Sequence, residues 1–139
     1  MRLINFLLLF GLILSFSSCN KDKALCKEAR DRLSNQKFSG TIFLCNAQPP
    51  DMDFLDATAT VLSVTEDEVS FLLVSDNGLI DTVLNFGIEC RVPEEEAVLL
   101  FQNEEGHEHW QYNQSPDRVS FPFSYPNCLD NTHFEGLAE

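Results

Sequence analysis

Apolar and polar side chains alternate along most of the chain after residue 37. In residues 118–125, Val119, Phe121 and Phe123 alternate with polar residues, which is typical of a β-strand with one buried face. Pro122 predicts an edge or bulged position for this strand, because proline has no N–H to donate to a sheet. Comparable patterns predict eight strands in all, over residues 38–45, 57–64, 69–75, 79–86, 97–102, 108–113, 118–125 and 132–138.

The number and spacing of these segments predict an all-β fold. Short strands joined by acidic turns, such as Glu66-Asp67-Glu68, favour an antiparallel eight-stranded meander that closes into a barrel, because closure leaves no exposed edge. A two-sheet β-sandwich is the alternative, and the periodicity does not separate the two. No linker or repeat interrupts the strands, so a single domain is expected.

A short helix is expected before the first strand. It covers residues 23–34, with Asp22 as its N-cap and an apolar stripe at Leu25, Ala29 and Leu33. A helix followed by Phe38-Ser39-Gly40-Thr41-Ile42 resembles the entry to a lipocalin-type barrel, in which the first strand usually carries Gly-x-Trp. In this chain Ile42 stands where that family has tryptophan. The resemblance implies a lipocalin-like architecture and no particular ligand.

The first 18 residues have the layout of a secretory signal peptide. Arg2 precedes an apolar stretch over residues 3–16 that Asn5 and Ser15 interrupt, and two serines follow. An uncleaved transmembrane helix is the alternative. Fourteen helical residues would extend about 21 Å, which is less than the roughly 30 Å of a bilayer core. Residues 1–18 are therefore excluded from the predicted fold.

Phe16-Ser17-Ser18-Cys19 resembles the lipobox of bacterial lipoproteins, with phenylalanine where that family usually has leucine. In that family the cysteine becomes the first mature residue and carries a diacylglyceryl thioether and an N-acyl chain such as palmitate. The resemblance implies that Cys19 anchors the protein in a membrane. Asn20 follows in place of the aspartate that retains many lipoproteins at the inner membrane, which favours the outer membrane. Residues 19–24 would then form a tether, and residues 25–139 the β domain.

The chain contains five cysteines, an odd number that needs an explanation in an exported protein. Lipidation of Cys19 leaves an even set, which predicts two disulfides in an oxidising compartment. These four are Cys26, Cys45, Cys90 and Cys128. A metal site is the alternative, but none of the four belongs to a Cys-x-x-Cys pair. Three pairings exist, and proximity alone favours Cys26 with Cys45 and Cys90 with Cys128.

Charge divides the chain after the leader into two unequal parts. Residues 19–37 carry six basic and three acidic side chains, whereas Arg91 and Arg118 alone oppose nineteen acids in residues 38–139. A cationic stem beside a lipid anchor can lie against anionic headgroups, and the acidic body is repelled by the same surface and by nucleic acid. We therefore expect a membrane contact through the anchored stem and no nucleic-acid partner.

The sequence offers little catalytic chemistry. It has no Gly-x-Ser-x-Gly elbow, His-Glu-x-x-His helix or phosphate-binding glycine loop, so we expect a non-enzymatic protein without a cofactor. His107 and His109 would project from one face of a strand and are weak candidates for a metal site. A polar turn with solvated imidazoles is favoured instead, with Trp110 and Tyr112 pointing into the core.

These features predict a lipid-anchored envelope protein whose acidic β domain binds a protein, a glycan or a cation outside the cytoplasm. Two other classes stay open. A lipocalin-like carrier of a small apolar ligand would need a barrel that its aromatic side chains do not fill. An inhibitor or immunity protein would use acidic loops to block a basic enzyme cleft.

Overall fold

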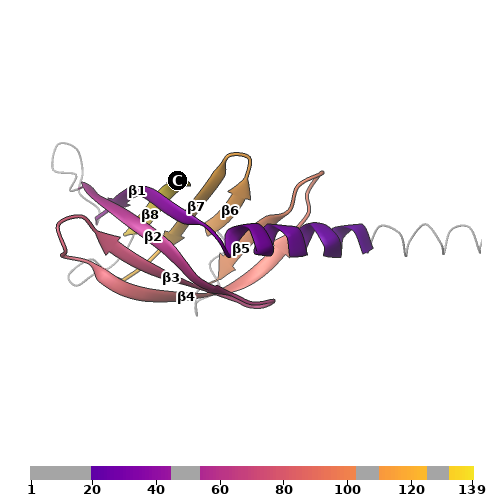
Figure 1. The fold of residues 1–139 in the computed structure, drawn as a ribbon, viewed down its shortest axis with the longest axis horizontal. Coiled ribbons are helices and arrows are strands. Elements are labelled where there is room, and N and C mark those ends of the chain that lie inside the picture. Colours follow the sequence, from indigo (N-terminus) through magenta and orange to yellow (C-terminus); the bar gives the residue numbers. More distant parts are fainter. Residues whose placement is uncertain (1–19, 45–53, 103–109, 125–131) are drawn as a thin grey trace, which may run out of the picture.

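A computed structural model describes residues 20–44, 54–102, 110–124 and 132–139. A helix over residues 20–33 precedes an eight-stranded antiparallel barrel (Figure 1). The strands are β1 (Lys37–Phe43), β2 (Phe54–Val64), β3 (Glu68–Ser75), β4 (Asp81–Arg91), β5 (Val98–Gln102), β6 (Trp110–Gln114), β7 (Asp117–Pro122) and β8 (His133–Ala138). Each strand pairs with the next, and β1 also pairs with β8. The predicted all-β meander barrel is confirmed, and the sandwich alternative is wrong.

All eight predicted strands are present, with bounds that differ by a few residues. The largest difference is in β4, which continues five residues past the predicted end because Gly87 to Arg91 pair with β5. The expectation for Pro122 is wrong. β7 pairs with β6 on one side and β8 on the other, so it is not an edge strand. Pro122 is the last residue of β7 and lies two residues beyond Ser120, the last residue that pairs with β6. At this position the missing N–H of proline leaves no hydrogen bond to β6 unmade.

The barrel interior contains a cluster of phenylalanine rings. Its members come from five strands and are at most 6% exposed: Phe71, Phe86, Phe101, Phe121 and Phe134. Ring centroids lie 4.7 Å apart for Phe71 and Phe121, 5.5 Å for Phe71 and Phe101, and 5.3 Å for Phe121 and Phe134. These are the separations of aromatic pairs in contact. Rings from opposite walls therefore meet inside the barrel.

The seam between β1 and β8 depends on two glycines. A Cβ atom on Gly40 would lie 1.9 Å from the carbonyl oxygen of Glu135, and a Cβ atom on Gly136 would lie 2.6 Å from the Phe134 ring. Any larger residue at Gly40 would have to displace the backbone of the neighbouring strand. Ile42, at the position of the lipocalin tryptophan, is fully buried. Glycine thus lets the strands approach closely enough to close the barrel.

The N-terminal helix packs on one end of the barrel with its predicted apolar stripe. Ala29 and Leu33 are fully buried in the main core, and Leu25 packs against it. Burial of one leucine side chain contributes about 1.5–3 kcal/mol. The helix already includes residue 20, so Asp22 lies inside it and the predicted N-cap is wrong. Figure 1 shows the helix extending away from the barrel along the long axis. None of the helices in the described ranges is long and apolar enough to cross a membrane.

Candidate functional site

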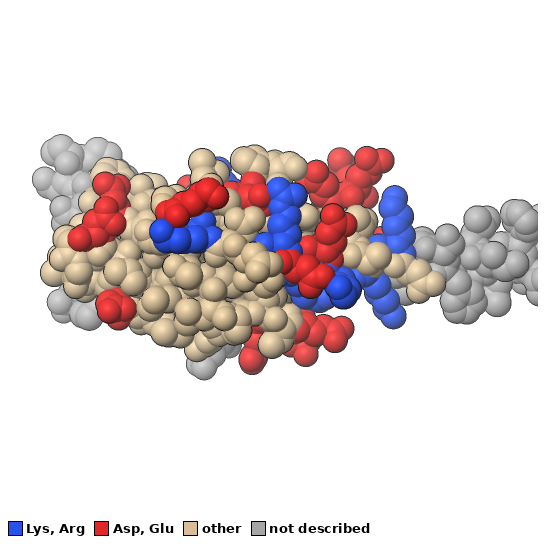
Figure 2. All heavy atoms as spheres, in the orientation of Figure 1, with Lys and Arg blue, Asp and Glu red and all other residues tan. Residues whose placement is uncertain are grey.

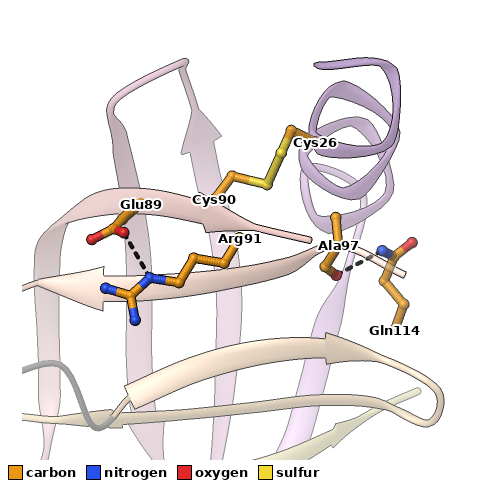
Figure 3. Close-up of a disulfide and its surroundings, with 6 residues drawn as sticks. All are labelled: Cys26, Glu89, Cys90, Arg91, Ala97 and Gln114. Atoms are coloured by element: carbon orange, nitrogen blue, oxygen red, sulfur yellow. Dashed lines mark hydrogen bonds and ion pairs between the residues drawn. A yellow bond between two sulfur atoms is a disulfide. The ribbon is translucent and has the colours of Figure 1, made fainter. Parts of the chain in front are cut away.

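A disulfide joins the N-terminal helix to the barrel. Cys26 is bonded to Cys90 near the end of β4, with the two Cα atoms 5.9 Å apart (Figure 3). The pairing of Cys26 with Cys45 that proximity favours is therefore wrong, as is that of Cys90 with Cys128. The apolar stripe of the helix packs on the end of the barrel where β4 ends. This packing places Cys26 beside Cys90, which is 64 positions away in the sequence. Cys45 and Cys128 lie outside the described residues.

A polar network fixes the last turn of the helix. Arg32 donates two hydrogen bonds to Asp117 Oδ2, from Nη2 at 2.5 Å and from Nε at 3.1 Å. The Tyr112 hydroxyl donates to the other carboxylate oxygen of Asp117. Asp117 begins β7 and its side chain is only 16% exposed. The network therefore connects the helix with the β6–β7 turn from a side that the disulfide does not reach.

The same network perturbs the ionisation of Tyr112. Burial raises the pKa of the Tyr112 phenol well above its usual value, and the hydrogen bond to the Asp117 carboxylate raises it further. Both effects favour the neutral hydroxyl, since a phenolate would be desolvated and would face a carboxylate. Tyr112 is thus a structural hydrogen-bond donor over the physiological pH range. No signal in the sequence links it to Asp117 and Arg32, because the three come from separate elements.

A groove of about 760 Å³ lies between the helix and the turn after β2. Its helix side is formed by one face on which Lys23, Lys27 and Arg30 are spaced four and three residues apart. Val64, Thr65 and Glu66 form the opposite side, and the Cys26–Cys90 disulfide contributes to its lining. Asp22 and Asp31 line the same side, so the disulfide holds a helix face with both cationic and acidic side chains beside the barrel.

Charged side chains are unevenly distributed over the surface. Figure 2 shows lysine and arginine gathered where the helix meets the barrel, and a broad area of the barrel in this view without charged side chains. The two arginines of the barrel are both engaged by carboxylates. Arg91 Nε lies 2.7 Å from Glu89, and Arg118 Nη2 lies 2.5 Å from Glu135. Their charges are compensated locally, so the other acidic residues of the barrel determine its net charge.

An aromatic row crosses the barrel end opposite the helix. Phe43 of β1 stacks on His133 of β8, with centroids 4.6 Å apart, and meets Phe54 of β2 edge to face at 5.3 Å. Trp110 packs on the other side of His133 at 5.2 Å. The register of the strands explains the row, since Phe43 is paired with Phe54 on one side and with His133 on the other. Its members come from four different strands, so no local pattern in the sequence marks this cluster.

Of the remaining predicted site residues, some lie in the described part of the chain and others lie outside it. Tyr112 is fully buried and Trp110 packs against the core, as expected. Cys19, His107 and His109 lie outside the described residues, so neither the lipidation nor the weak metal candidates can be placed. Among the residues that are described, no group of three His, Cys, Asp or Glu side chains is arranged to hold a metal ion.

Comparison of the chain with protein-family models, with curated proteins and with solved structures finds no match.

Proposed function

We propose that this protein is a lipid-anchored lipoprotein of the cell envelope whose acidic barrel binds a partner through its outer surface. Cys19 would carry the acyl chains in the outer membrane, and the helix over residues 20–33 would stand between the anchor and the barrel. The partner would be an envelope protein or a glycan outside the cytoplasm. The role is that of a binding module without catalysis.

One observation favours a binding role on the outside over that of a carrier. The five phenylalanine rings meet across the barrel interior, where a lipocalin-like carrier needs space for its ligand. An apolar ligand would have to displace rings that are almost completely buried. A carrier role is for this reason our second choice.

The charge distribution supports the orientation in this proposal. Six of the nine basic residues lie between Lys21 and Lys37, on the helix that follows Cys19 and at the start of β1, and nineteen acids lie beyond. Each lysine or arginine near an anionic membrane surface contributes about 1 kcal/mol of attraction. The stem would therefore be drawn to the membrane and the barrel would be held away from it.

Cell fractionation tests the anchor. Cys19→Ala should move the protein from the membrane fraction to the soluble fraction, because a secretory signal would remain without an acylation site. The double variant Cys26→Ser, Cys90→Ser is the matched control, since it also removes cysteine but should stay with the membrane. An unmodified Cys19 thiol in the membrane-bound mature protein would contradict the lipoprotein assignment.

Affinity capture tests the binding role. Immobilised residues 20–139, which contain the whole described core, should retain an envelope protein or glycan from a solubilised extract. We expect high salt to release this partner, because the acidic surface would contribute much of the attraction. Retention of small apolar molecules alone would favour the carrier instead.

A further inference from the structure

One arginine that lines the groove between the helix and the β2–β3 turn has an unsatisfied hydrogen-bond donor among the described residues. The Nε atom of Arg30 is buried and has no hydrogen-bond partner within the described part of the chain. An unpaired buried donor on a charged group is costly, and such a group commonly indicates an ion or ligand that completes it. Arg30 differs in this from Arg32, two residues later, whose guanidinium is bound by Asp117.

Other charges in the groove define what could satisfy Arg30. Lys27 is paired with Asp31 at 2.7 Å, so these two side chains largely compensate each other. Lys23 lies about one helical turn before Lys27 on the same face and adds a second cation to that of Arg30, and its neighbour Asp22 also lines the groove. Glu66 lies on the opposite side of the groove. A ligand with an anionic and a cationic group would match both sides.

We propose that this groove binds a phosphoethanolamine group, with the phosphate at Arg30 and Lys23 and the ammonium at Glu66. Guanidinium groups suit phosphate oxygens because their donors form a planar fork. The volume of the groove, about 760 Å³, falls within the range of small-ligand sites. If Cys19 is the anchor, as proposed above, the phospholipid headgroups of the anchoring membrane are the natural source of this group. The ligand chemistry itself does not depend on the anchor.

Titration with soluble headgroups tests the site without a membrane. The protein would be residues 20–139, and the probes would be glycerophosphoethanolamine, glycerol 3-phosphate and inorganic phosphate, followed by NMR of the arginine Nε–Hε signals. We expect saturable binding of glycerophosphoethanolamine that shifts the Arg30 signal. Glycerol 3-phosphate, which lacks the amine, should bind more weakly.

Two variants separate the groove from general attraction to a cationic helix. Arg30→Gln should weaken glycerophosphoethanolamine binding about tenfold, the loss expected for one hydrogen-bonded charge. Lys21→Gln, which removes an equal charge from an exposed position of the same helix outside the groove, should leave this binding unchanged. Melting curves of both variants would show that the fold is retained.

Each outcome decides a part of the proposal. Equal losses in the two variants, or shifts that never saturate, would reduce the effect to non-specific charge and overturn the site. If glycerol 3-phosphate binds as tightly as glycerophosphoethanolamine, Glu66 does not bind the ammonium group. If inorganic phosphate competes with the same affinity as glycerophosphoethanolamine, a lipid headgroup is excluded as the source of the ligand. Vesicles of phosphatidylethanolamine should then bind wild type better than Arg30→Gln. None of these measurements involves Cys19. The headgroup site and the lipid anchor can therefore be refuted independently of each other.

Discussion

Replacement of Phe121 by alanine would test whether the barrel interior is solid. Truncation of a buried phenylalanine costs about 3–5 kcal/mol. Phe121 is fully buried and contacts the rings of Phe71, Phe86 and Phe134. Each such aromatic pair contributes about 0.5–1.5 kcal/mol beyond the buried area, so we expect the upper half of the range, about 4–5 kcal/mol. For a domain of this size the melting temperature should fall by about 15–20 °C.

The assay is urea unfolding of wild type and variant, combined with an apolar dye that fluoresces in hydrophobic cavities. Phe123→Ala is the matched control, because Phe123 follows the end of β7 and is only half-buried. It should cost clearly less than Phe121→Ala. A hollow barrel would behave differently, since truncation would merely enlarge an existing cavity. A loss below about 2 kcal/mol for Phe121→Ala, or saturable binding of a fatty acid to wild type, would refute the solid core.

Three further predictions concern the attachment of the helix and the closure of the barrel. Reduction of the Cys26–Cys90 disulfide, which spans 64 residues, should cost about 4 kcal/mol in urea unfolding; an unchanged midpoint would contradict this. Stability should fall as the pH rises above about 10, because the unfolded chain releases the tyrosine proton before the folded protein releases that of Tyr112. Tyr112→Phe should flatten this decline in a pH series of melting curves, and a decline of the same slope would exclude Tyr112 as its cause. Gly40→Ala should prevent folding. Gly87→Ala should melt near the wild-type temperature, because the added Cβ atom would lie 3.7 Å from its nearest neighbour. Equal melting temperatures of the two variants by circular dichroism would refute the tight seam.

The strands could be predicted because the two faces of a barrel wall differ in solvent contact. In β3, Val69, Phe71 and Leu73 are fully buried and alternate with partly exposed residues, which is the period-two pattern visible in the sequence. The number of strands and the need to cover edges favoured closure into a barrel, but the periodicity alone left a two-sheet sandwich open. Local patterns thus contained most of the architecture.

The contacts between distant elements could not be predicted in the same way. Separation along the chain favours Cys45 as the partner of Cys26, but the helix lies beside β4, where Cys26 bonds to Cys90. The link between Arg32 and Asp117 spans 85 residues and leaves no periodic signal. If two disulfides form, Cys45 and Cys128 are the remaining pair, and mass mapping without reduction should find neither as a free thiol.

The seam between β1 and β8 also constrains the order in which the chain can fold. Lys37 contacts Glu139 across 102 residues, and Phe38 is paired with Ala138. Before β8 is available, β1 and β7 would each expose an unpaired edge, and such edges invite association with other chains. Closure must therefore wait until β8 is present, about 100 residues after β1, which implies slow folding dominated by long-range contacts. A cell producing this protein would need to keep the incomplete chain from meeting its own copies.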